Sequence, residues 1–122
     1  MSIHAWLPYL MSLVLFLVGL FAVLSRKNLL KIIVGLSISE YAANLFLILV
    51  GYRTGGHAPI FSPGESIDPS AMVDPLPQAL VLTSIVIGLG TTTLAAALAV
   101  RHALHHGTLE CGAEPEETEV QE

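Results

Sequence analysis

Three long stretches without a charged side chain constrain this chain more than any other feature. They run from Ser2 to Ser25, from Tyr41 to Tyr52 and from Pro75 to Val100. Only 12% of all residues are charged, against roughly 25% in a typical soluble domain. A helix needs about 20 mostly apolar residues to cross a hydrocarbon core about 30 Å thick, and each stretch with its flanks supplies that length. The sequence therefore predicts an all-α integral membrane protein with three transmembrane helices.

The expected membrane domain covers residues 1–103, with helices at about 5–25, 29–52 and 75–102. Asp74 and Pro75 are typical of the cap and the first position of a helix, which supports the start of the third one. Residues 53–74 are rich in Gly and Pro and form an irregular connection. Six of the ten acidic residues lie between Glu110 and Glu122. Residues 104–122 are therefore expected to form a disordered acidic tail, and the formal net charge of −5 belongs to it.

The basic residues predict the orientation. Arg26, Lys27 and Lys31 make up three of the five basic residues and surround a short connection without acids. Such loops lie on the cytoplasmic side of a membrane. The prediction is an N-out, C-in protein of the cell membrane, with an external loop at 53–74 and a cytoplasmic tail.

A single carboxylate interrupts the second apolar segment. Glu40 lies close to the middle of that segment, and a charge at the bilayer centre costs at least about 2.5 kcal/mol. At 3.6 residues per turn, Ser37, Glu40 and Asn44 share one face of the predicted helix. An intramembrane Glu is a functional-site hypothesis by default, whereas Ser37 and Asn44 also fit a role as hydrogen-bonding groups between helices.

The third segment presents a face of small side chains. Ser84, Gly88, Thr91 and Ala95 recur at helical spacing, and small residues let membrane helices approach closely. Gly19 on the first segment is a further candidate for a close helix contact. Three helices of this size cannot enclose a site of their own, so we expect other membrane subunits as partners.

Other chemistry has little support in the sequence. His102, His105 and His106 share a helical face at the membrane boundary, where they are interfacial side chains unless an enclosing site exists. We predict no metal site and no cofactor. No phosphate cradle, activated nucleophile or nucleic-acid patch is present, so the chain alone is not a conventional enzyme.

The stretch from Asp74 to Gly88, with the sequence DPLPQALVLTSIVIG, resembles a signature of one family. It is similar to the DPLPQALVLTAIVIG motif of the C subunit of Mrp-type multisubunit Na⁺/H⁺ antiporters, which is in turn similar to the K subunit of respiratory complex I. The resemblance covers roughly Leu10 to Val100. It implies a subunit of a membrane assembly that exchanges cytoplasmic Na⁺ for external H⁺.

The resemblance also implies roles for single residues. Glu40 matches the helix-two Glu that relays protons in the complex I relative. The second intramembrane Glu of that relative falls on Thr91, which cannot titrate but can hydrogen-bond a bridging water. Glu40, with Asn44, Ser37 and Thr91 around it, is thus the predicted translocation site, and the next proton acceptor is expected on a neighbouring subunit.

Three alternatives remain open. Glu40 can ligate Na⁺ directly, because carboxylate, amide and hydroxyl oxygens are hard ligands. The chain can be a purely structural adaptor, in which Ser84, Gly88 and Ala95 hold larger subunits together. It can also belong to a redox-driven membrane arm of the complex I or membrane-bound hydrogenase type.

Overall fold

Three helices lie side by side in the computed structural model, which describes residues 3–66 and 68–112. They are α1 (Ile3–Ser25), α2 (Leu29–Gly51) and α3 (Pro75–His106), with a short 3₁₀ helix, η1 (Pro69–Ala71), in the connection before α3. Each long helix is long and apolar enough to span a membrane. The all-α, three-span architecture predicted from the charge-free stretches is confirmed.

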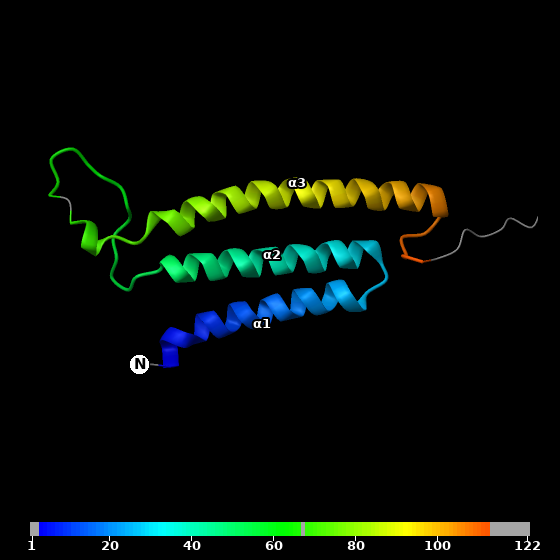
Figure 1. The fold of residues 1–122 in the computed structure, drawn as a ribbon, viewed down its shortest axis with the longest axis horizontal. Coiled ribbons are helices and arrows are strands. Elements are labelled where there is room, and N and C mark those ends of the chain that lie inside the picture. The colour runs from blue at the N-terminus through cyan, green and yellow to red at the C-terminus, as the bar shows by residue number, and fades with distance from the viewer. Residues whose placement is uncertain (1–2, 67, 113–122) are drawn as a thin grey trace, which may run out of the picture.

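Helix α2 is the middle element of the layer, between α1 and α3 (Figure 1). It packs against both neighbours, whereas α1 and α3 do not contact each other within the described residues. The connection between α1 and α2 lies at the same end as the C-terminal end of α3, and residues 52–74 lie at the opposite end with the start of α1 (Figure 1). A functional group on α2 is therefore shielded by this chain on two sides and open to lipid or partner subunits on the other two.

Helix α3 begins as the sequence predicts and ends later than predicted. The Asp74 side chain accepts a hydrogen bond from the Leu76 backbone amide at 2.9 Å, and Pro75 takes the first position. The helix continues to His106 and is capped by Gly107 in the left-handed conformation at φ 72°. At 1.5 Å per residue its 32 residues span about 48 Å. This length exceeds a hydrocarbon core, so the histidines lie on a helical extension beyond it.

The first residues after α3 fold back onto the connection between α1 and α2. The Leu29 amide donates to the Leu109 carbonyl and the Cys111 amide donates to the Lys27 carbonyl, both at 2.9 Å. Residues 107–112 thus have a defined path, although they belong to the segment expected to be disordered. The rest of the predicted tail, from residue 113 onward, lies outside the described residues.

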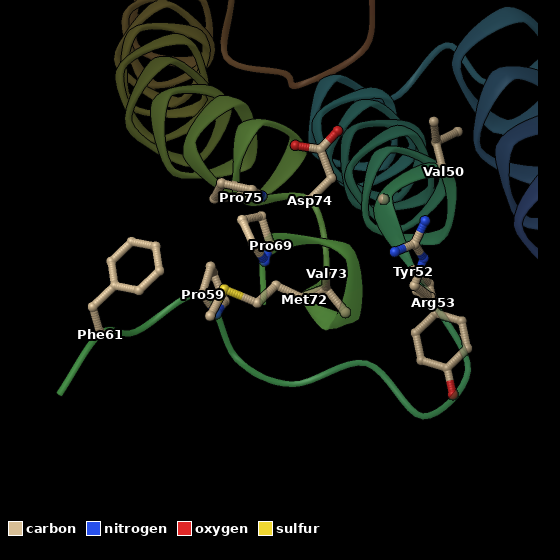
Figure 2. A pocket seen from close by; sticks show the side chains of 11 residues that line it. Val50, Tyr52, Arg53, Pro59, Phe61, Pro69, Met72, Val73, Asp74 and Pro75 are labelled. Atoms are coloured by element: carbon tan, nitrogen blue, oxygen red, sulfur yellow. The ribbon is translucent and has the colours of Figure 1, made fainter. Parts of the chain in front are cut away.

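The connection from 52 to 74 carries local structure that the sequence did not predict. The Ser70 hydroxyl and amide both donate to the Asp68 carboxylate, and these bonds hold the pKa of Asp68 below its ordinary value. Arg53 donates from its guanidinium to the Ser70 carbonyl. A cavity of about 630 Å³ lies here, lined by residues from the end of α2, the connection and the start of α3 (Figure 2). It is open and lies at the loop end of the helices, away from the middle of the membrane spans.

Candidate functional site between α2 and α3

Glu40 is the central residue of α2, eleven positions from Leu29 and eleven from Gly51. Its side chain is half-buried and points toward α3. A Cβ atom added at Gly88 would overlap the Glu40 carboxylate, so the two residues are in direct contact across the helix interface. Only a glycine leaves that space, and Gly88 is thus the feature of α3 that accommodates the carboxylate.

Two contacts fix the register between these antiparallel helices. Glu40 meets Gly88, and Gly51 packs against Pro77, whose side chain would lie 2.8 Å from a Cβ at Gly51. Glu40 and Gly51 are eleven residues apart along α2, and Pro77 and Gly88 are eleven residues apart along α3. The same register places Ser84 at the level of Asn44 and Thr91 at the level of Ser37. The polar residues predicted from the two separate patterns therefore lie along one interface.

Asn44 is the most unusual polar group of this interface. Its side chain is only 7% exposed, and neither Oδ1 nor Nδ2 has a hydrogen-bond partner among the described residues. Buried amide groups are nearly always paired, because an unpaired one costs about 1–3 kcal/mol. Asn44 lies one turn after Glu40 on the α3-facing side of α2. The unpaired Asn44 amide is thus one helical turn from Glu40.

Both hydroxyl groups predicted to lie around Glu40 already donate hydrogen bonds. The Ser37 hydroxyl donates to the Ile33 carbonyl at 3.1 Å, and the Thr91 hydroxyl lies 3.1 Å and 3.0 Å from the Ile87 and Gly88 carbonyls. These are bonds to the residue's own helix, as expected for Ser and Thr in membrane helices. Thr91 is also exposed, on the edge of the interface rather than within it.

Glu40 itself has no hydrogen bond or ion pair to any group in the described part of the chain. The residues opposite it on α3 are Ser84, Gly88, Thr91 and Ala95, none of which titrates. Helix α1 contacts the other side of α2 through Gly19, Gly35 and Ser39. A titratable partner for Glu40 must therefore come from outside these three helices.

Three of the small residues of α3 line its side toward α2. Gly88 is buried, and Ser84 and Ala95 are half-buried along the side that faces α2. The sequence did not identify Val81 and Ala99, which are the apolar core residues of the same face. Val81 and Ala99 lie seven and eleven positions from Gly88, which puts them on the same helical face. The pattern cannot be recognised in the sequence, because most other residues of this segment are apolar too.

The histidines after Arg101 form a separate group at the end of α3. The rings of His102 and His106 stack with centroids 4.3 Å apart, and His102 Nε2 lies 3.2 Å from the Glu110 carbonyl oxygen. Within the described residues no cluster of His, Cys, Asp or Glu is suited to hold a metal ion. These rings connect the end of α3 with the segment that folds back beneath it.

Comparison with known proteins gives consistent relatives. The family model of NADH-ubiquinone/plastoquinone oxidoreductase chain 4L matches residues 7–113. The Na⁺/H⁺ antiporter subunit C1 of Staphylococcus epidermidis is 45% identical over 91 residues, which cover 75% of each chain. Subunit C1 of Staphylococcus saprophyticus is 38% identical and covers 79% of this chain and 84% of its own.

Two solved structures have the same fold. A chain of the membrane-bound sulfane sulfur reductase, described as an archaeal respiratory membrane complex, is 51% identical with a TM-score of 0.76, covering 84% of this chain and 92% of its own. A chain of the Mrp complex from Dietzia sp. is 30% identical with a TM-score of 0.72, covering 88% of this chain and 78% of its own. Both relatives come from membrane assemblies.

Proposed function

The chain belongs to the NADH-ubiquinone/plastoquinone oxidoreductase chain 4L family, and within it to the C subunits of Mrp-type antiporters, so we propose that Glu40 contributes to ion translocation in such a complex. It is a multi-pass protein of the plasma membrane and a transporter subunit. Its proposed task is to pass protons between hydrated regions formed with neighbouring subunits, while the complex exchanges Na⁺ for H⁺. The proposed orientation is N-out and C-in.

The observation that carries this proposal is the unpaired Glu40 carboxylate in the middle of α2. A carboxylate that only held the three helices together would have a partner on one of them, because an unpaired polar group in a membrane interior is costly. Glu40 instead rests against Gly88, and its side chain is only half-buried by this chain. This arrangement supports a site completed by a group on another subunit.

Proton transfer explains this arrangement better than direct Na⁺ binding. Na⁺ would need several hard oxygen ligands around it, whereas a proton needs only the one carboxyl group that Glu40 supplies. The proposed carrier is therefore the Glu40 carboxyl group, with the next acceptor on a partner.

The experiment compares Glu40→Gln and Glu40→Ala with the matched control Glu65→Gln in the exposed connection. Each variant is introduced into the whole complex, and Na⁺-dependent proton movement is measured in inverted vesicles together with the amount of assembled complex. We expect both Glu40 variants to lose about a hundredfold or more of the exchange rate at normal assembly. Full exchange in an assembled Glu40→Gln complex would rule out the translocation role.

A purely structural role predicts a different pattern. If Glu40 only anchors a partner side chain, its substitution will lower the yield of complex rather than the rate per assembled complex. Gly88→Leu, which fills the space occupied by the carboxylate, will then be at least as damaging to yield. The ratio of rate to yield separates the two functions.

A redox-driven membrane arm is the second candidate function. The 51% identity with a chain of the archaeal sulfane sulfur reductase complex favours it specifically. Mass spectrometry of the purified complex distinguishes the two machines, because only a redox-driven one will contain subunits with redox centres. Antiport driven by an imposed Na⁺ gradient alone supports the antiporter.

A further inference from the structure

A groove runs between α1 and α2 near their connection, and we propose that it binds an anionic glycerophospholipid. The lipid phosphate lies at Arg26 and Lys31, and one acyl chain follows the groove along the helices. The groove has a volume of about 350 Å³ and is lined by Ala22, Arg26, Leu30, Lys31, Val34, Gly35 and Ile38. This site is separate from the α2–α3 interface and does not depend on the role of Glu40.

The floor of the groove is closed by contact between the two helices. Gly35 is buried, and a Cβ added to it would lie 2.9 Å from the Ala22 Cβ and 3.1 Å from the Val23 backbone nitrogen. Leu30 and Val34 line the groove as well and are 52% and 57% exposed. The groove is therefore an open apolar channel on the surface of the helix pair rather than a passage through it.

The length of the groove suits an acyl chain. From Lys31 to Ile38 the backbone advances seven residues along α2, or about 10 Å at 1.5 Å per residue. One leaflet of a hydrocarbon core about 30 Å thick measures about 15 Å. The groove thus extends from the end of the helix pair through much of one leaflet, whereas a free phosphate would occupy only its charged end.

The charges at the end of the groove predict which headgroup it takes. Arg26 directly follows α1, Lys31 is the third residue of α2, and both side chains are exposed. Among the described residues that line the groove, none is acidic. Basic residues between membrane helices at the headgroup level bind anionic lipid headgroups. Charge complementarity therefore favours an anionic lipid over a zwitterionic one.

A second groove between the same helices lacks this selectivity. It has a volume of about 430 Å³, lies toward the 52–74 end of the pair, and is lined by Ser12, Leu13, Phe16, Ala42, Ala43, Phe46 and Leu47. None of these residues is charged. An acyl chain that lies there meets no group that distinguishes its headgroup, so this groove is an internal reference for the first one.

A helix of a partner subunit fits the groove less well than a lipid chain does. Membrane helices associate through small residues that let their backbones approach closely. The small residues here, Ala22 and Gly35, are already engaged in the contact between α1 and α2. The exposed wall consists of larger side chains, Leu30 and Val34, which present an uneven apolar surface that a flexible acyl chain can follow.

The test uses the intact purified complex in vesicles of phosphatidylcholine. The vesicles contain a small fraction of phosphatidylglycerol with a photoactivatable group on one acyl chain, and parallel vesicles contain phosphatidylcholine with the same group. After illumination, tandem mass spectrometry locates the cross-links on this chain and measures their yield per assembled complex. We expect the phosphatidylglycerol probe to label residues 34–38 severalfold more than the phosphatidylcholine probe, and both probes to label residues 42–47 equally.

Substitutions of the basic residues test the headgroup contact. We expect Arg26→Gln and Lys31→Gln each to lower labelling by phosphatidylglycerol about fivefold, because each basic residue near an anionic lipid contributes a factor of that size. Lys31→Arg should keep the labelling. Lys27→Gln is the matched control, since it removes the same charge from the same connection at a residue outside the groove lining. Its labelling should change little.

A second pair of variants tests the groove while all charges remain. Val34→Trp fills the groove and should lower labelling of residues 34–38 by both probes. Leu36→Trp adds the same bulk at a residue that is 45% exposed and lies outside the groove lining, so it should leave labelling unchanged.

Equal labelling by the two probes at residues 34–38, or an equal loss in Lys27→Gln and Lys31→Gln, would overturn the selection of an anionic lipid. Absence of labelling in the groove, or a cryo-electron microscopy map of the complex with a partner helix seated there, would overturn the lipid site itself.

Discussion

The two interfaces of α2 are built from similar small residues but treat polar groups in opposite ways. Toward α1, Gly19 packs so closely that an added Cβ would lie 2.7 Å from the Ser39 backbone nitrogen and 2.9 Å from the Gly35 carbonyl oxygen. The Ser39 hydroxyl is bonded to Gly35, and the Tyr9 hydroxyl donates to the Leu49 carbonyl at 2.7 Å. Every polar group named there has a partner.

Toward α3, the glycine makes room for a side chain rather than for a backbone. The Glu40 carboxylate fills the space beside Gly88. Asn44, one turn from Glu40, has polar atoms with no hydrogen-bond partner among the described residues. Membrane helices gain little from hydrophobic attraction to one another and depend on close packing and hydrogen bonds. The α1–α2 interface uses close packing and hydrogen bonds for stability, whereas the α2–α3 interface is closely packed at Glu40 but leaves the polar atoms of Asn44 unpaired within the described residues.

This difference separates an interface whose polar groups are paired from the interface that contains the proposed translocation site. Helices α1 and α2 are held together by close backbone contact and by paired polar groups. Unsatisfied groups that persist in a buried interface are a mark of functional sites, because the surrounding structure must compensate for them. Substitutions that add the same methyl group to each interface test this difference.

The largest effect is expected from Gly19→Ala. Its new Cβ would meet the backbone of α2, which cannot move aside without separating the helices. Overpacking of this kind costs about 1–3 kcal/mol. We expect a clear loss of assembled complex on native gels and a lower midpoint of thermal unfolding. The control is Gly90→Ala on α3, whose added Cβ has no neighbour within 4 Å. Equal losses in both variants would contradict the backbone contact.

Gly88→Ala should affect exchange more than assembly. The added methyl group meets the end of the flexible Glu40 side chain, which can rotate away. We expect near-normal yield and a roughly tenfold slower exchange in vesicles, since catalysis of proton transfer depends on placement within hydrogen-bond reach. In a Glu40→Ala background the same change should have no further effect, because the group it displaces is gone. Additive losses in the double variant would disprove this contact.

Much of the fold could be predicted from the sequence because its signals are local. Charge-free stretches determine the spans, and Asp74 with Pro75 determines the start of α3. The sequence predicts an end of this helix at about residue 102, close to the end of the apolar segment, whereas α3 continues through the histidines to His106. The helix stops only at Gly107, where the backbone turns left-handed.

The site could be predicted only as a set of residues on separate helices. Helical spacing put Ser37, Glu40 and Asn44 on one face and Ser84, Gly88 and Ala95 on another. It could not supply the register that brings Glu40 against Gly88, because the irregular 52–74 connection does not fix it. The hydrogen bond from the Tyr9 hydroxyl to the Leu49 carbonyl depends on the same kind of long-range information for α1.

The smallest effect is expected from Thr91→Val, which tests where the α2–α3 site ends. The Thr91 hydroxyl already donates to its own helix, and its side chain is exposed at the edge of the interface. We therefore expect the exchange rate in vesicles to fall by no more than about twofold, because the hydroxyl proton is already used within α3 and only the oxygen lone pairs remain for another group. Thr93→Val is the matched control, because that hydroxyl donates to Leu89 at 2.7 Å on the same helix. A tenfold loss in Thr91→Val alone would extend the proton path to Thr91 and would place a bridging water on the partner side of Glu40.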